Sequence, residues 1–341
     1  MTTDQLVANA NALVAPGKGI LAADESSGTI KKRFASIGAE STEDNRRSYR
    51  ELLFTTPGAG DFISGVILFD ETIRQSAADG ASFVDVLTGQ GIIPGIKVDT
   101  GAKPLAGSPG ETVTEGLDGL RERLDEYYAL GARFTKWRAV IRIDSHSPSR
   151  HCIHANAEAL ARFAALSQEA GLVPIVEPEV LMDGDHSIER CARVTEAVQH
   201  VVFRALRLHR VALEGMLLKP NMVLPGKDHD PQASVEAVAK ATLRVFRRTV
   251  PAAVPGIVFL SGGQSDEQAT AHLSAMNALS DSPPWQLSFS YGRALQAAPL
   301  KAWAGKAENA DAARQALYHR ARLNGEARYG RYDAAMEQDV A

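Results

Sequence analysis

Short apolar runs of strand length recur along this chain, and amphipathic segments separate them. Eight such runs begin at residues 19, 65, 95, 134, 173, 215, 256 and 287. Successive starts lie 30 to 46 residues apart. Each interval has room for a turn, a helix and a return loop, which two neighbouring parallel strands require.

The segments between the runs repeat their apolar residues with the period of a helix. In residues 157–171, Leu160 and Phe163 belong to one apolar face, and Gly171 is a typical helix stop. Residues 189–209 have the same character. Eight strand–helix repeats predict an α/β fold, a (β/α)8 TIM barrel in a single domain. A doubly wound open sheet is the alternative.

The two ends of the chain differ from the repeats. Residues 1–16 predict a short helical lead-in, and residues 307–324 predict an alanine-rich closing helix. Residues 325–341 are polar and short of apolar anchors, so we expect a mobile tail that contributes little to the fold. The single domain is expected to span residues 1–341, because no low-complexity linker divides it.

Composition and charge narrow the class of protein. The 341 residues are 45% hydrophobic and 23% charged, as in ordinary soluble globular proteins. A net charge of −4 gives no reason to expect nucleic acid or a membrane as partner. Two cysteines fit a reducing compartment, and the N-terminus has no secretory pattern. We therefore expect a cytoplasmic protein.

Polar residues of catalytic type stand at the ends of seven of the eight apolar runs. They are Asp24, Lys97, Lys136 with Arg138, Glu177 with Glu179, Lys219, Ser261 with Gly262 and Gly263, and Ser290 with Gly292 and Arg293. Parallel strands of a barrel point these ends at one mouth, where such barrels carry their chemistry. Charges crowded there are costly unless they neutralise one another or a ligand. The pattern predicts an active site.

Lys219 ends the apolar run EGMLLK and precedes a proline. Taken alone, it could be a strand tip in water. A lysine amine attacks a carbonyl only when neutral, and both apolar surroundings and a like charge such as Lys136 favour the neutral form. We therefore interpret Lys219 as a Schiff-base nucleophile, with the neighbouring carboxylates available for proton transfer.

The glycine-rich ends of the last two runs predict phosphate binding. LSGGQSDEQA and FSYGRALQA each offer serine and glycine amides just before a helix, and helix N-termini bind phosphate through free N–H groups. Arg293 adds a bidentate cation. Plain turns would explain Gly262 and Gly263 alone, but they explain poorly why two such loops occur together with a cation.

Eight segments, in this order, resemble class I fructose-1,6-bisphosphate aldolases over roughly residues 10–310. They are GKGILAADES, GVILF, GIKVD, KWR, VEPE, LEGMLLKPNM, FLSGGQS and FSYGRALQ. The combination of LLKPNM with LSGGQS and SYGRALQ is highly specific. The resemblance implies a barrel that reversibly cleaves fructose 1,6-bisphosphate into dihydroxyacetone phosphate and glyceraldehyde 3-phosphate. It also implies a homotetramer that uses neither a metal nor another cofactor.

The resemblance also implies a role for each site residue. Lys219 would be the Schiff-base lysine. Glu177, supported by Lys136 and Glu179, would be the acid/base that dehydrates the carbinolamine. Asp24 would handle the proton of the C4 hydroxyl, and Arg138 is a further candidate for substrate binding. The residues implied for the 1-phosphate are Ser261, Gly262, Gly263, Ser290, Gly292 and Arg293. Those implied for the 6-phosphate are Ser26, Thr29, Arg33 and Lys97.

The chain departs from the family at its end. Animal members end in a tyrosine that reaches the active site, whereas this chain ends in Ala341 and its nearest candidates are Tyr329 and Tyr332. The role of the tail is therefore open. So is the preference for a bisphosphate over a monophosphate, or for sedoheptulose 1,7-bisphosphate.

Other classes of protein fit the residues less well. The possible metal ligands fall into two sets, His146, His151, Cys152 and His154, and Asp183, Asp185 and His186. Neither set has a recognised zinc spacing. The glycines of GKGILA precede their strand, which argues against dinucleotide binding. Another imine-forming barrel, such as a deoxyribose-phosphate aldolase or a transaldolase, and a non-catalytic binding protein are the remaining alternatives.

Overall fold

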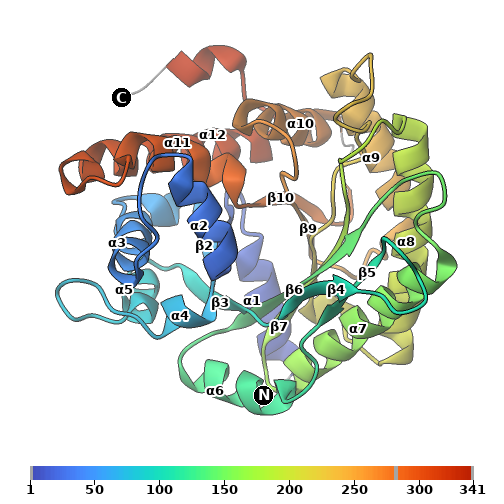
Figure 1. Ribbon diagram of the computed structural model, residues 1–341, viewed down its shortest axis with the longest axis horizontal. Coiled ribbons are helices and arrows are strands. Elements are labelled where there is room, and N and C mark those ends of the chain that lie inside the picture. The colour runs from blue at the N-terminus through green and yellow to red at the C-terminus, as the bar shows by residue number, and fades with distance from the viewer. Residues whose placement is uncertain (1–2, 280–282, 339–341) are drawn as a thin grey trace.

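A computed structural model describes residues 3–279 and 283–338, and these residues fold around a closed barrel of eight parallel strands (Figure 1). The strands of the barrel are β1 (Gly19–Ala23), β2 (Ile63–Leu68), β3 (Ile93–Lys97), β6 (Phe134–Ile141), β7 (Val173–Val180), β8 (Leu217–Leu218), β9 (Gly256–Phe259) and β10 (Gln286–Tyr291). Because β10 pairs with β1, the ring has no free edge. The predicted barrel and its eight strands are confirmed, and the open sheet is excluded.

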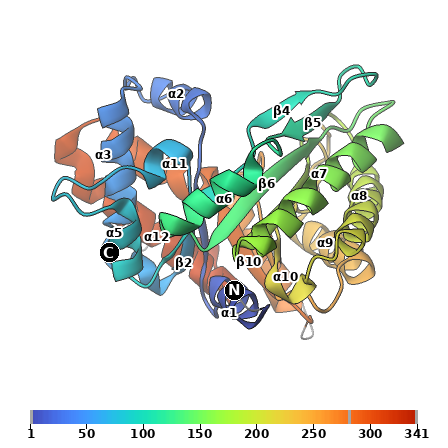
Figure 2. The ribbon, with the colours of Figure 1, turned by 90° about the horizontal axis from the view of Figure 1, so that it is seen from below.

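Helices surround the barrel. They are α1 (Thr3–Leu13), α2 (Ser27–Ala35), α3 (Glu43–Phe54), α4 (Asp70–Ile73), α5 (Phe83–Gly89), α6 (Leu120–Ala129), α7 (Arg150–Glu169), α8 (Ile188–Leu208), α9 (Val235–Thr249), α10 (Asp266–Leu279), α11 (Arg293–Trp303) and α12 (Ala310–Arg328). Ser149, Ser187 and Ser234 cap α7, α8 and α9 by accepting a backbone N–H three residues on. Because α12 packs against α3, the beginning and the end of the chain lie side by side (Figures 1 and 2).

The N-terminal end of the barrel is filled with apolar side chains. Phe134, Ile175 and Leu217 belong to a cluster of buried residues that also includes Leu13 of α1. The ring of Phe134 packs so closely on Gly95 of β3 that a Cβ there would overlap it. Helix α1 therefore closes this end of the barrel, and the strands are open to chemistry only at the other end.

Along the same strands, the next inward-facing residues are charged. Side chains two positions apart point to the same face of a strand. Lys136 follows Phe134 in this way, Glu177 follows Ile175, and Lys219 follows Leu217. The alternation thus places a charged layer directly above an apolar floor.

A hairpin that the sequence analysis missed extends from the open end of the barrel. Strands β4 (Gly101–Pro104) and β5 (Thr112–Glu115) pair antiparallel between β3 and α6. Figure 2 shows this hairpin and α2 on the same side of the barrel, opposite α1. Both elements therefore flank the mouth.

The C-terminal segment takes more part in the fold than predicted. Helix α12 runs to Arg328, and Gly325 and Ala327 are buried within it. Arg328 Nη1 donates to the carbonyl oxygen of Lys18 (2.6 Å), and its Nη2 donates to Gln286 Oε1 (2.9 Å). The expectation that the tail contributes little to the fold is wrong for residues 325–328, because Gly325, Ala327 and Arg328 are buried and Arg328 bonds to Lys18 and Gln286.

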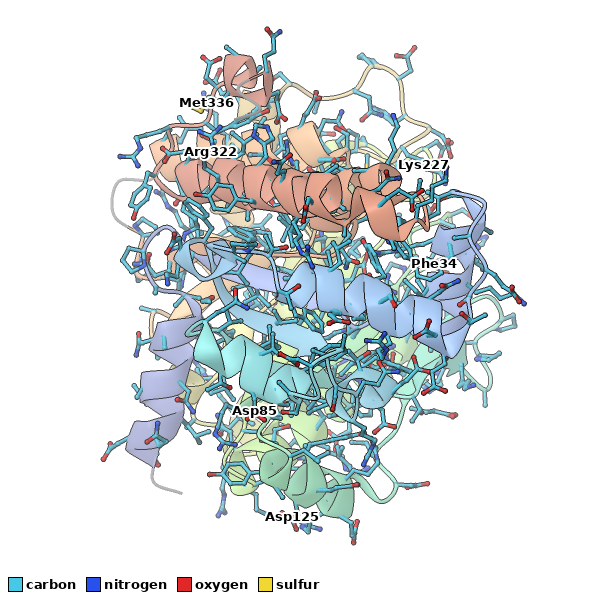
Figure 3. The ribbon with its side chains drawn as sticks, turned by 90° about the vertical axis from the view of Figure 1, so that its left-hand side faces the viewer. Phe34, Asp85, Asp125, Lys227, Arg322 and Met336 are labelled. Atoms are coloured by element: carbon cyan, nitrogen blue, oxygen red, sulfur yellow. The ribbon has the colours of Figure 1, made fainter. Side chains whose placement is uncertain are left out.

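Residues further along the tail also make contacts. Residues 334–338 form a short 3-10 helix, and Glu337 accepts hydrogen bonds from Arg320 (2.5 Å) and from the Tyr332 hydroxyl (2.8 Å). In Figure 3, Met336 of this segment lies away from Phe34 of α2 and Lys227, which share the opposite side of the view. The mobility of the tail stays a prediction, and residues 339–341 lie outside the described residues.

Candidate active site

A pocket of about 920 Å³ opens at the C-terminal ends of the strands. Every site residue predicted from the sequence lines this pocket except Gly263. Gly263 has a φ of +84°, a conformation that favours glycine, and a Cβ there would lie 2.8 Å from Met182 Sδ. Gly263 therefore makes the turn of its loop, and its contact with a phosphate stays a prediction.

Lys219 lies at the bottom of the pocket and not at the surface. Its backbone N–H donates to the Val176 carbonyl (2.8 Å), which continues the pairing of β8 with β7. The residue is only 4% exposed, and its Nζ lies 3.3 Å from Glu177 Oε1. This burial excludes a strand tip in water.

Two lysines and two carboxylates form a buried ionic cluster around Glu177. Lys136 Nζ lies 2.6 Å from Asp24 Oδ2 and 3.3 Å from Glu177 Oε2. Glu177 thus contacts both Lys136 and Lys219. Lys136 was predicted to act on Lys219 as a like charge, whereas its positive charge is balanced by Asp24 and Glu177.

The cluster fixes the ionisation of three of its members. Burial alone would lower the pKa of Lys136, but Asp24, Glu177 and Asp99 outweigh burial and hold it well above its usual value. Burial alone would raise the pKa values of Asp24 and Glu177, but Lys136 and Lys219 outweigh burial and hold both below their usual ranges. Both carboxylates are therefore ionised at neutral pH, ready to accept protons.

The charged residues nearer the mouth of the pocket form ion pairs with one another. Arg138 Nε pairs closely with Glu179 Oε2, and Lys97 Nζ lies 2.5 Å from Asp99 Oδ1. Asp99 Oδ2 also accepts the backbone N–H of Arg138 (3.2 Å). These pairs brace the ends of β3, β6 and β7 against one another.

Glu25 lines the pocket and was not among the site residues predicted from the sequence. Its carboxylate accepts hydrogen bonds from Arg33, from Arg50 Nη1 (2.8 Å) and from Gln296 Nε2 (2.8 Å). It links α2, α3 and α11 at the wall of the pocket. Its position between Asp24 and Ser26 in the quoted segment GKGILAADES was a signal that could have identified it.

Other pocket residues were also missed. Among them are Asp70, Asp99, Arg123 and Tyr127. Asp70 directly follows the predicted second strand, so its position was available from the sequence. Arg123 and Tyr127 come from the side of α6, and no strand-end pattern marks them.

The loops predicted to bind phosphate present unpaired donors to the pocket. The Ser290 hydroxyl is buried and has no hydrogen-bond partner among the described residues. Gly292 caps α11, and Arg293, the first residue of α11, is exposed and forms no ion pair within the described part of the chain. A Cβ on Gly292 would lie 3.6 Å from Arg33 Nη2, so this arginine reaches the same helix N-terminus. Such a grouping of donors suits an anion.

Two of the residues considered as metal ligands have other partners. His151 Nδ1 lies 2.9 Å from Ser108 Oγ, and Asp183 pairs with Lys227 at 2.6 Å. Within residues 3–279 and 283–338, no three histidines, cysteines or carboxylates are grouped as metal ligands.

Below the loop that contains Ser261, a buried histidine contacts a buried glutamine. His272 Nδ1 lies 2.6 Å from Gln264 Oε1. Burial lowers the pKa of His272 to about 4. The usual histidine value applies in the unfolded chain, so folding requires this imidazole to remain neutral at mildly acidic pH.

We expect the His272→Asn variant to lose less stability in acid than the unsubstituted protein. As pH falls from about 6.5 towards 4, the unfolded chain binds a proton that the folded chain does not bind, so the free energy of unfolding falls by up to about 3 kcal/mol. Asparagine removes this contribution, while the other titrating groups stay the same. Urea unfolding of both proteins at pH 6.5, 5.5 and 4.5 measures the difference. Parallel pH dependences would contradict the prediction.

The fold and the site together define a class of enzyme. A buried amine in contact with a carboxylate, at the mouth of a (β/α)8 barrel with anion-binding loops, suits a lyase that forms an imine with a phosphorylated carbonyl compound. Comparison with known proteins identifies the family. The family model "Glycolytic: Fructose-bisphosphate aldolase class-I" matches residues 5–341.

Individual relatives agree with the family model. The chain is 61% identical to a "Probable fructose-bisphosphate aldolase class 1" of Xanthomonas axonopodis pv. citri, over 97% of this chain and 99% of that protein. It is 59% identical to "Fructose-bisphosphate aldolase 4, cytosolic" of Arabidopsis thaliana, over 97% of this chain and 84% of that protein. A solved fructose-bisphosphate aldolase from Plasmodium falciparum, in complex with TRAP and a small-molecule inhibitor, matches with a TM-score of 0.96 and 53% identity. That match covers 97% of this chain and 96% of the other.

The chain belongs to the class I fructose-bisphosphate aldolase family. It is a carbon–carbon lyase that reversibly cleaves fructose 1,6-bisphosphate into dihydroxyacetone phosphate and glyceraldehyde 3-phosphate through a lysine Schiff base. The family excludes a deoxyribose-phosphate aldolase, a transaldolase and a non-catalytic binding protein.

Proposed function

We propose that Lys219 forms the Schiff base and that Glu177 moves the protons of its formation. The observation that carries this proposal is the 3.3 Å contact between Lys219 Nζ and Glu177 Oε1 in a buried setting. Glu177 accepts a proton from Lys219, and the neutral amine attacks the C2 carbonyl of the sugar. The protonated Glu177 then gives this proton to the carbinolamine hydroxyl, which leaves as water. The resulting iminium carbon accepts the electron pair of the C3–C4 bond when that bond breaks.

Asp24 is the base for the second half of the reaction. As C3–C4 breaks, the C4 hydroxyl loses its proton to Asp24 and becomes the aldehyde of glyceraldehyde 3-phosphate. The low pKa of Asp24, caused by Lys136 and Lys219, keeps this carboxylate ionised before the proton arrives. Lys136 stays protonated between Asp24 and Glu177 and stabilises whichever carboxylate is charged.

The two phosphates bind on either side of Lys219. The residues that bind the 1-phosphate are Ser261, Gly262, Ser290, Gly292 and Arg293. The unpaired Ser290 hydroxyl and Arg293 guanidinium support this assignment. Ser26, Thr29, Arg33 and Lys97 bind the 6-phosphate, and Arg33 lies between the two phosphate sites because its Nη2 also reaches Gly292. The hydroxyls of Ser26 and Thr29 lie 3.2 Å apart at the start of α2, which supports a shared ligand.

Borohydride reduction in the presence of dihydroxyacetone phosphate tests the proposed nucleophile. We expect the label on Lys219 alone, because Lys97 and Lys136 are each held by a carboxylate at 2.5–2.6 Å. Digestion and mass mapping of the modified peptide identify the lysine. A label on Lys97 or Lys136, or no label, would contradict this mechanism.

Treatment with EDTA is expected to leave the rate of cleavage unchanged. In the proposed mechanism the iminium ion withdraws the electron pair, which is the task of a Lewis-acid metal in other enzymes. The measurement compares steady-state rates before and after exhaustive dialysis against EDTA. Loss of activity that zinc restores would contradict the proposal.

We further propose that the enzyme works in the cytoplasm as a homotetramer. The name of the Arabidopsis relative supports the location. Among the described residues, no helix combines the length and apolar character needed to cross a bilayer. Analytical ultracentrifugation tests the assembly, which should sediment at four times the chain mass of 36.5 kDa.

A further inference from the structure

Gln264 directly follows the loop Ser261–Gly263, yet it does not line the active-site pocket. Its side chain is buried at 4% exposure, and both ends of its amide are engaged. Oε1 lies 2.6 Å from His272 Nδ1, and Nε2 lies 3.7 Å from Met222 Sδ. Because a buried amide is costly to leave unpaired, these contacts fix the orientation of Gln264.

The partners of Gln264 connect the loop to the segment that contains Lys219. Met222 stands three residues after Lys219, and His272 belongs to α10. The side chain of Asn221 accepts the backbone N–H of Val180 (3.0 Å), the residue after Glu179. Asn221 Nδ2 also donates to the Met222 carbonyl (3.0 Å), so a buried chain of contacts runs beneath the site from α10 to the end of β7.

The loop above this chain has little freedom to move. A Cβ on Gly262 would lie 3.0 Å from Glu179 Oε1, so the backbone of the loop already packs against that carboxylate. The backbone N–H of Gln264 also donates to the Ser261 carbonyl (3.0 Å), which closes the turn. Loss of the Gln264 contacts beneath would let Ser261 and Gly262 shift relative to Lys219.

We propose that Gln264 and His272 are positioning residues that hold the loop Ser261–Gly263 at the distance from Lys219 that a phosphorylated ketone spans. The inference rests on the proposed function, in which this loop binds the 1-phosphate. Neither residue touches the substrate. Their effect is therefore specific to substrates that carry the phosphate.

The chemistry of the contact supplies a conservative variant. The imidazole donates from Nδ1 because the Gln264 oxygen accepts, and an asparagine side chain can donate an amide N–H from nearly the same position. His272→Asn therefore keeps the contact. His272→Leu removes it and leaves the Gln264 oxygen unpaired, and Gln264→Met removes it from the other side.

The test measures borohydride labelling of Lys219 as a function of ketone concentration, with dihydroxyacetone phosphate and with dihydroxyacetone. For His272→Leu and Gln264→Met, we expect the half-maximal concentration of the phosphorylated ketone to rise about 5- to 30-fold, from the usual cost of an unpaired buried group. His272→Asn should stay within about twofold of the unsubstituted protein. Labelling by dihydroxyacetone should be the same in all four proteins, which also shows that the variants are folded.

The possible results separate the two proposals. No label in the unsubstituted protein overturns the proposed nucleophile and this inference with it. A normal label there, with unchanged affinity in the leucine and methionine variants, overturns the inference alone. An equal loss for both ketones, or failure of either variant to fold while His272→Asn folds, shows a merely structural role and also overturns it.

Discussion

Replacing Lys219 with methionine is expected to abolish turnover and to leave the fold intact. Methionine has nearly the length of lysine and suits a buried position, but it has no amine to attack a carbonyl. We expect kcat to fall by about 10⁴- to 10⁶-fold, the range for loss of a covalent nucleophile. Glu177 keeps its contact with Lys136, so the ionic cluster does not lose all compensation. A coupled assay measures the rate, and circular dichroism reports the fold.

Lys97→Met is the matched control for that variant. Lys97 also ends a strand and lines the pocket, but its amine is paired with Asp99 and has no contact with Glu177 among the described residues. This control should still form the borohydride adduct with dihydroxyacetone phosphate. Activity of Lys219→Met within a hundredfold of the unsubstituted protein would contradict the assignment.

Replacing Glu177 with glutamine has the second largest expected effect. The amide keeps the shape of the side chain but cannot donate the proton that removes the carbinolamine hydroxyl. We expect kcat to fall by about 10²- to 10⁴-fold, the usual contribution of a positioned acid/base. Single-turnover kinetics with dihydroxyacetone phosphate should place the defect at imine formation, because the nucleophile is still present.

Glu179→Gln is the matched control, because it removes a negative charge from the same strand without removing the proposed proton donor. Glu179 lies on the same strand, is equally buried, and pairs with Arg138 instead of Lys219. We expect kcat to fall by less than about tenfold in this variant, because Glu179 contacts the partly exposed Arg138 and not Lys219, so no proton donor is lost at the reacting atoms. Equal losses in the two variants would show that Glu177 acts through charge alone.

The sequence predicted the strands and their charged ends because both depend on local periodicity. Ile175 and Glu177 are two residues apart, so they share a face of β7 whatever the rest of the chain does. Once eight such strands form a barrel, the side chains of Glu177, Lys136 and Lys219 come together at its mouth. These site residues could therefore be predicted without knowing which distant segments contact one another.

The residues that the sequence analysis missed depend on contacts between distant segments. Tyr127 reaches the pocket because its hydroxyl donates to Asp70 across 57 residues (2.9 Å). The hairpin of β4 and β5 has four residues in each strand, too few for a visible pattern. Arg328 was assigned to a mobile tail because its charge suggests exposure, whereas carbonyl oxygens of the N-terminal segment accept its hydrogen bonds.

The seam between β1 and β10 joins residues that the ribosome makes early to residues that it makes late. Ile20 pairs with Ser290, and the Ser288 hydroxyl donates to the Lys18 carbonyl, 270 residues away. At about 5–20 residues per second, the first strand waits roughly 15 to 55 s for its last neighbour. Its unpaired edge is open to other nascent chains during that time. We therefore expect synthesis of this enzyme to depend on chaperones that shield the growing chain, and fragments that stop before residue 286 to aggregate.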